Sequence, residues 1–91
     1  MIVKRHVESF FDATEEEQEA ILSAVREAKG ALDAEFHPDG YNLGVNVGVA
    51  AGQTVMHVHV HVIPRFTGDT PNPRGGVRHC IPGRGCYEPK P

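Results

Sequence analysis

The sequence has no long apolar run, only two cysteines and no internal repeat. No stretch is long and apolar enough to cross a membrane, and polar residues come too early for a secretory signal, so we expect a cytoplasmic protein without membrane contact. In that compartment Cys80 and Cys86 are expected to stay reduced, and their spacing is not that of a paired zinc motif. A chain of 91 residues fits one small domain with a thin core, which favours stabilisation by a partner.

An overall excess of positive charge is also missing. The net charge of -3 argues against a nucleic-acid-binding tail. The charge is uneven, however: residues 1–40 hold four basic and ten acidic side chains, whereas residues 41–91 hold five basic and two acidic ones. The second part of the chain therefore favours an anionic ligand.

The first half of the chain predicts one helix. Thr14 is a good N-cap, and Glu17 completes a capping box with it. Pro38 and Gly40 supply a turn after the helix. Between these signals, apolar residues recur at helical spacing and predict one buried face: Ile21, Val25, Ala28, Leu32 and Phe36.

The remaining segments predict strands and a tail. Residues 41–49 and 55–63 alternate in the manner of strands, and the short link at 50–54 joins them as an antiparallel pair. Residues 1–3 are compatible with a strand end. From residue 67 to residue 91 the chain is rich in Gly and Pro without periodicity, which predicts an extended C-terminal tail. The expected fold class is α+β, with one main helix packed on a small antiparallel sheet.

Three histidines, His57, His59 and His61, alternate with valines in the second predicted strand. Alternate side chains of a strand share a face, so the three imidazoles would lie together and the valines would face the core. Neutral imidazole is a common zinc ligand, so a metal site on these three residues is one hypothesis. Against it, no acidic residue lies next to the run, and Asp69 is the nearest downstream.

The residues around the histidines favour a phosphate site instead. Gly52 allows a close backbone approach, while Gln53 and Thr54 offer an amide and a hydroxyl. Arg65 adds a positive charge downstream. An imidazole can attack phosphorus covalently and so split one hard displacement into two easier steps. From the residues alone, a phosphate-transfer enzyme, a non-catalytic phosphate-binding module and a metal site remain alternatives.

The run from His57 to Ile63, His-Val-His-Val-His-Val-Ile, resembles the signature of the histidine triad (HIT) family. Residues 51–55, Ala-Gly-Gln-Thr-Val, together with Pro64 and Arg65, are most similar to the Fhit-type and bacterial diadenosine polyphosphate hydrolase branch. The resemblance implies a HIT-like fold in which residues 1–91 form a partial HIT domain that lacks the family's N-terminal strands. It also implies a homodimer with a continuous sheet.

The same resemblance implies a nucleotide hydrolase or transferase that cleaves at the α-phosphate of a dinucleoside polyphosphate or a nucleoside phosphoramidate. His59 would be the nucleophile that carries the nucleotidyl group, with His57 and His61 on either side. Arg65 is the arginine we would test for a further phosphate contact. No tightly bound cofactor is implied, although a divalent cation could accompany the substrate phosphates. The residues in the family's phosphate-contacting positions are Asn46, Gly52, Gln53 and Thr54.

Overall fold

The structure is a computed structural model that describes residues 7–85. The predicted strand end at residues 1–3 and Cys86 lie outside the described residues. The chain forms, in order, the 3₁₀ turn η1 (Phe10–Asp12), the helix α1 (Glu15–Phe36), the strand β1 (Gly40–Val45), the 3₁₀ turn η2 (Val49–Ala51), the strand β2 (Val60–Arg65) and the short 3₁₀ helix η3 (Gly76–Cys80). The predicted α+β class, with one main helix and a small antiparallel sheet, is confirmed.

Helix α1 begins where the sequence predicts because Thr14 caps it. The backbone N–H of Glu17 donates to the Thr14 hydroxyl at 3.1 Å, and the backbone N–H of Thr14 donates to the Glu17 carboxylate at 2.8 Å. This reciprocal capping box satisfies two backbone donors at the helix start. The helix ends at Phe36, after which His37 takes a left-handed conformation with φ of 50°. No helix in the described part of the chain is long and apolar enough to span a membrane.

The apolar face of α1 packs against β2 of the sheet. Ile21 belongs to the buried core, and Val25 packs against that core. The expectation that Phe36 closes this face is wrong, since its side chain is 49% exposed. The contact near this end of the helix is polar instead, because the Tyr41 hydroxyl donates to the Asp33 carboxylate at 2.6 Å. The core therefore lies toward the N-terminal part of α1.

The two strands pair antiparallel, with Val45 of β1 opposite Val60 of β2. The pairing is as predicted, but the strands are not residues 41–49 and 55–63. Both are six residues long, and the connection between them covers residues 46–59. Gly48 and Gly52 explain the difference, because their φ values of 87° and 93° take the chain out of the strand conformation.

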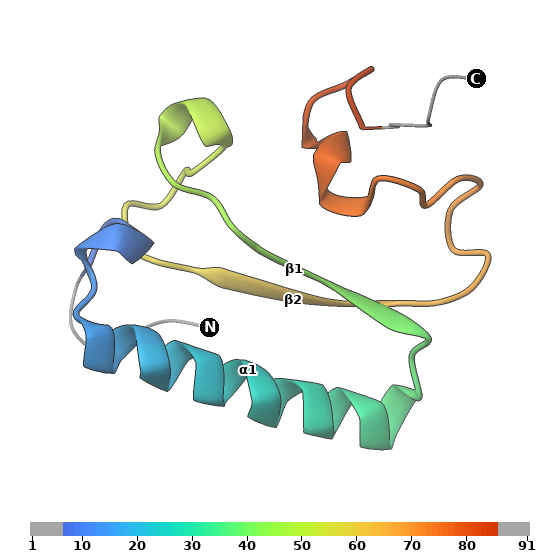
Figure 1. Cartoon of the computed structure of the whole chain (residues 1–91), viewed down its shortest axis with the longest axis horizontal. Helices are drawn as coiled ribbons and strands as arrows, with labels where there is room; N and C mark the ends of the chain where they lie inside the picture. Colours follow the sequence, from blue (N-terminus) through green and yellow to red (C-terminus); the bar gives the residue numbers. More distant parts are fainter. Residues whose placement is uncertain (1–6, 86–91) are drawn as a thin grey trace.

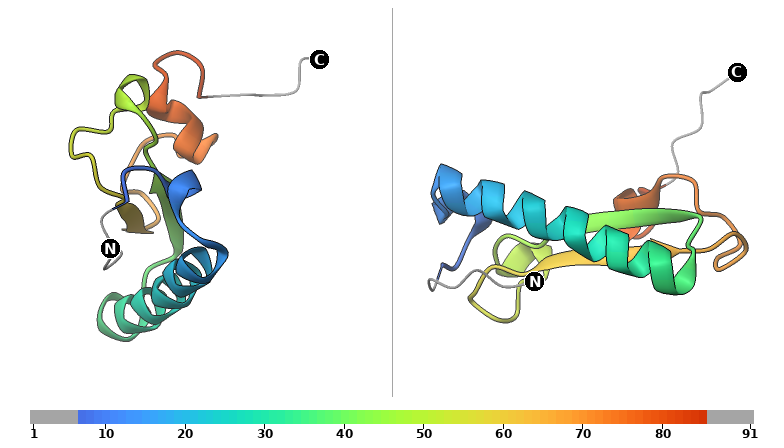
Figure 2. Two further views of the ribbon diagram at one scale, coloured as in Figure 1. Left: turned by 90° about the vertical axis from the view of Figure 1, so that its left-hand side faces the viewer. Right: turned by 90° about the horizontal axis from the view of Figure 1, so that it is seen from below.

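Figure 1 shows α1 along one side of the β1–β2 pair, with η2 and η3 on the other side. The two views in Figure 2 agree with this arrangement. Within the C-terminal tail the short η3 forms and lies against β1. Gly75 and Gly76 have positive φ values that let the chain turn into η3. One side of the sheet thus holds the core, and the other is left for the connecting segments.

Candidate functional site

A cavity of about 240 Å³ lies where β2 meets the preceding loop. All three histidines and all four predicted loop residues line it, so the structure brings these seven together. The sequence reasoning missed Val55, whose only signal was its position between the loop and the histidines. The complete lining is Asn46, Gly52, Gln53, Thr54, Val55, His57, His59 and His61.

The valines between the histidines fix the direction of the imidazole rings. Val58 and Val60 are only 2% and 9% exposed and belong to the core. The backbone N–H of Val58 also donates to the Val7 carbonyl at 2.7 Å, which anchors the chain before β2 begins. The prediction of one histidine strand is corrected, since only His61 of the three lies within β2. The alternation of buried and exposed side chains nevertheless continues upstream and keeps His57 and His59 out of the core.

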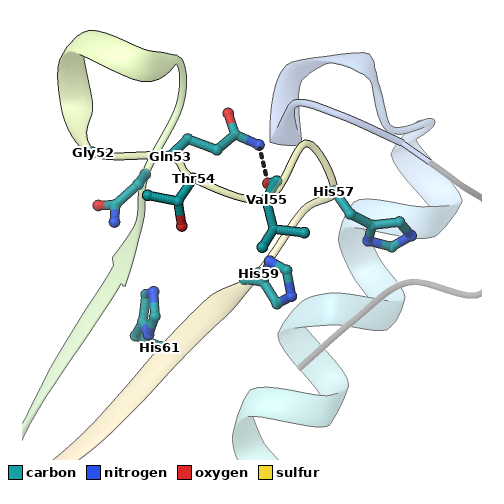
Figure 3. Close-up of a pocket in the computed structure, with 8 residues that line it drawn as sticks. Gly52, Gln53, Thr54, Val55, His57, His59 and His61 are labelled. Carbon is teal, nitrogen blue, oxygen red and sulfur yellow. Dashed lines mark hydrogen bonds between the residues drawn. The ribbon is translucent and has the colours of Figure 1, made fainter.

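The rings follow one another along the chain. The ring centroids of His57 and His59 are 6.1 Å apart, and the ring planes make an angle of 61°. Figure 3 shows His59 between His61 and His57, with Thr54 and Val55 above it. The Nδ1 atom of His57 lies 3.3 Å from the Val58 carbonyl oxygen, so a proton on Nδ1 would donate to that carbonyl. His59 therefore occupies the central position of the three.

This geometry does not support the metal hypothesis. Among the residues from 7 to 85, no group of three or more His, Cys, Asp or Glu side chains is arranged to hold a metal ion. Zinc sites need three or four ligand atoms converging at about 2 Å from the ion.

The side chain of Gln53 holds the loop in place. It is 8% exposed, and its Nε2 donates to the carbonyls of Glu8 at 2.6 Å and Val55 at 3.2 Å. Its Oε1 accepts from the backbone N–H of Gly48 at 2.8 Å. The bond to Val55 is the dashed line in Figure 3. The Gln53 amide thus ties the loop to itself and to the segment around residue 8, and it shapes the cavity through the backbone.

Other polar side chains that line the cavity have no hydrogen-bond partner in the described part of the protein. They are an amide, a hydroxyl and two imidazoles: Asn46, Thr54, His59 and His61. Each of these groups can donate a hydrogen bond to an anionic oxygen. In Figure 3 the Thr54 side chain points toward the histidines. The cavity therefore presents a cluster of available polar groups next to a fixed loop.

Arg65 does not line this cavity. Its Nε and Nη2 atoms each donate to the Asp69 carboxylate at 2.7 Å, and its Nη1 donates to the Asn42 side-chain oxygen. The Arg65 guanidinium beside Asp69 lowers the pKa of that carboxyl to about 2. Arg65 lies four residues beyond His61 along β2, a separation of about 13 Å. The structure thus places the predicted arginine in an ion pair at the far end of the strand.

Comparison with known proteins decides the family. The HIT domain family matches residues 1–68. The chain belongs to the HIT family. The bis(5'-nucleosyl)-tetraphosphatase (asymmetrical) of Schizosaccharomyces pombe is 39% identical over 69 residues, which cover 76% of this chain and 38% of that protein. The resemblance to the HIT family drawn from the sequence is confirmed.

Solved HIT structures have the same fold. A HIT family protein from Bacillus anthracis is 46% identical with a TM-score of 0.66, and the match covers 69% of this chain and 45% of that one. A zinc-bound histidine triad family protein from Mycobacterium smegmatis is 35% identical with a TM-score of 0.66, covering 74% and 49% of the two chains. The HIT chain described here therefore spans less than half the length of each of these relatives.

Proposed function

We propose that this HIT chain is a nucleotidyl hydrolase or transferase that acts at the α-phosphate of a dinucleoside polyphosphate or a nucleoside phosphoramidate. The observation that carries this proposal is the cavity in which Asn46, Thr54, His59 and His61 present polar groups without partners in the described structure. The name of the fission yeast relative, a nucleosyl tetraphosphatase, supports the substrate class.

In the proposed reaction His59 is the nucleophile. A neutral ring nitrogen of His59 forms a bond to the α-phosphorus while the bond from phosphorus to the leaving group breaks. The leaving group takes the electron pair of that bond, as an anion where it is a polyphosphate and with a proton from solvent where it is an amine. Water then attacks the same phosphorus, the bond from nitrogen to phosphorus breaks, and nucleoside monophosphate leaves as the water proton passes to solvent. His59 returns to its starting form. Its central position supports this assignment, since His57 and His61 lie on either side of it.

The loop would stabilise the charge that develops on the phosphoryl oxygens. Fixed donors are most effective when they need no rearrangement during the reaction. The three hydrogen bonds of the Gln53 side chain hold the loop in one conformation. Thr54 and Asn46 could then donate to the phosphoryl oxygens from fixed positions.

Mass spectrometry of a quenched reaction tests this function. After incubation with diadenosine tetraphosphate, we expect a protein species that carries one adenylyl group, and we expect the His59→Ala variant to lack it. His37→Asn is the matched control, because it removes a histidine outside the cavity and asparagine tolerates the left-handed conformation of that position. Binding of the nucleotide without an adduct or product would favour the non-catalytic binding module instead.

We also propose that the protein is a homodimer. Among the described residues β1 pairs only with β2, so its other edge offers unpaired backbone groups. Such an edge favours pairing with a second copy of the same chain. Sedimentation at micromolar concentration should give the mass of a dimer, and a well-folded monomer would contradict this proposal.

A further inference from the structure

We propose that the sheet surface beyond His61 binds the leaving half of a dinucleoside polyphosphate, a nucleoside polyphosphate anion. This inference rests on the proposed function, because it extends the same site. The observation behind it is the position of an open strip of sheet, formed by Gly44 and Ile63. This strip lies between the histidine cavity and a cationic segment, residues 70–85. We call this surface the leaving-group strip.

The strip is on the same face of the sheet as the histidines. Gly44 lies opposite His61, and Asn42 lies opposite Ile63. Residues paired directly across two strands share a face, so these four residues lie on one face of the sheet. The side chain of Val60 points to the other face and belongs to the core. A ligand seated at the histidines can therefore continue along this face without crossing the sheet.

The strip is flat and open. A Cβ atom added to Gly44 would meet no atom within 4 Å. Ile63 is 48% exposed, although it is a large apolar residue in a strand. An apolar side chain beside an open glycine offers a surface against which a sugar or a base can pack. From His61 to Arg65 the face extends about 13 Å, much longer than a single leaving atom requires.

A cationic segment borders the far end of the strip. Residues 70–85 contain Arg74, Arg78 and Arg84 and no acidic residue. Within this segment η3 lies against β1, and a Cβ added to Gly76 would be 3.4 Å from the Asn42 side-chain nitrogen. Figures 1 and 2 show η3 on the same side of the sheet as η2. The charge of this segment is complementary to a polyphosphate.

Two carboxylates near the strip at this end of the sheet are engaged in hydrogen bonds within the described residues. Asp69 pairs with Arg65 through two bonds of 2.7 Å. Asp39 accepts a hydrogen bond from the backbone N–H of Thr67 at 2.8 Å. A neighbouring cavity of about 230 Å³ has no carboxylate in its lining, which consists of Arg65, Thr70, Asn72, Pro73, Gly76 and His79. A larger cavity at the same end, of about 470 Å³, is lined by both Asp39 and Asp69, so the positive charge that borders the strip comes from residues 70–85 alone.

The first test measures how strongly two ligands bind. AMP should occupy only the histidine cavity, whereas a methylene-bridged diadenosine tetraphosphate, which cannot be hydrolysed, should also cover the strip. We expect Gly44→Leu to weaken binding of the tetraphosphate analogue about ten-fold and binding of AMP at most about two-fold, the smaller loss arising because the new side chain lies beside His61 on the opposite strand. Gly44→Ala is the matched small substitution and should have a much smaller effect, because its Cβ meets no neighbour.

The second test removes charge from the cationic segment. We expect Arg74→Gln and Arg78→Gln each to weaken binding of the tetraphosphate analogue about two- to five-fold, with a weaker salt dependence. Arg26→Gln is the control, since Arg26 lies on α1, across the sheet from the strip. Equal losses for AMP and the analogue, or no loss for either, would overturn the proposal.

A third measurement separates this proposal from the proposed function. The p-nitrophenyl ester of AMP has a small leaving group, so it reports on His59 without the strip. If the wild-type protein forms an adenylyl adduct with this ester and Gly44→Leu binds the analogue as tightly as wild type, the strip is rejected and the enzyme is retained. If Gly44→Leu selectively loses analogue binding and the wild-type protein forms no adduct, the strip is supported as a binding site and the hydrolase is rejected.

Discussion

The two ends of the exposed sheet face differ in how their polar side chains are used. At the histidine end, His59, His61 and Thr54 line a cavity without hydrogen-bond partners among residues 7–85. At the other end, Arg65 donates to both Asp69 and Asn42. Both ends contain residues that could bind phosphate by type alone. The difference in pairing indicates that the polar groups of the first end are available for ligand, whereas Arg65 at the second end holds the sheet and its turn together.

The same contrast exists within the loop above the histidines. Gln53 and Thr54 are neighbours in the sequence, and both were predicted to contact phosphate. The Gln53 side chain is buried and bonded to backbone groups, whereas the Thr54 side chain is exposed beside the cavity. Two adjacent residues of a binding motif can therefore have separate tasks, one in stability and one in ligand contact.

The largest expected effect on stability follows from this division. We expect Gln53→Met to lower the free energy of unfolding by about 1–3 kcal/mol, because the backbone groups of Gly48, Glu8 and Val55 lose their partner. Urea denaturation followed by circular dichroism measures this change. We expect Thr54→Val to change stability by less than about 0.5 kcal/mol, since the residue is exposed.

Ligand binding should instead depend on Thr54, whose substitution hardly changes stability. Removing a hydroxyl that bonds to a charged phosphate should weaken AMP binding about ten-fold, as measured by calorimetry. If Thr54→Val destabilises the fold and Gln53→Met does not, the assignment of the two neighbours is reversed.

The sequence predicted elements whose signals are local and missed features that depend on distant partners. The capping box of Thr14 and Glu17 lies within one turn, so the start of α1 could be predicted. The strand limits could not, because alternation of residue types does not show that Gly48 and Gly52 turn the chain. The bond from Gln53 to the carbonyl of Glu8 joins residues 45 positions apart. No pattern in one sequence shows such a contact.

A smaller loss of stability is expected from substitution of Gly52, and it tests whether the loop needs the left-handed conformation of this residue. Its φ of 93° strains any residue with a side chain, although a Cβ would meet only the Asn46 nitrogen at 3.8 Å. We expect Gly52→Ala to cost about 1–2 kcal/mol of stability from backbone strain. Gly30→Ala within α1 is the control and should instead stabilise the protein by up to about 1 kcal/mol. Thermal denaturation of both variants measures the difference, and equal effects would show that the loop is not strained.

The smallest effect concerns the paired end of the sheet and appears only in acid. The hydrogen bonds from Arg65 and from the backbone N–H of Phe66 lower the pKa of the Asp69 carboxyl from 3.8 to about 2. A lowered pKa in the folded state means that the pair contributes stability above about pH 4, and that this contribution is lost as the pH falls toward 2. Wild-type protein should therefore lose more stability over this range than Asp69→Asn, measured by urea denaturation at each pH. If Asp69 makes no such contribution, the two acid profiles will run parallel, and the ion pair cannot be what holds the turn after β2.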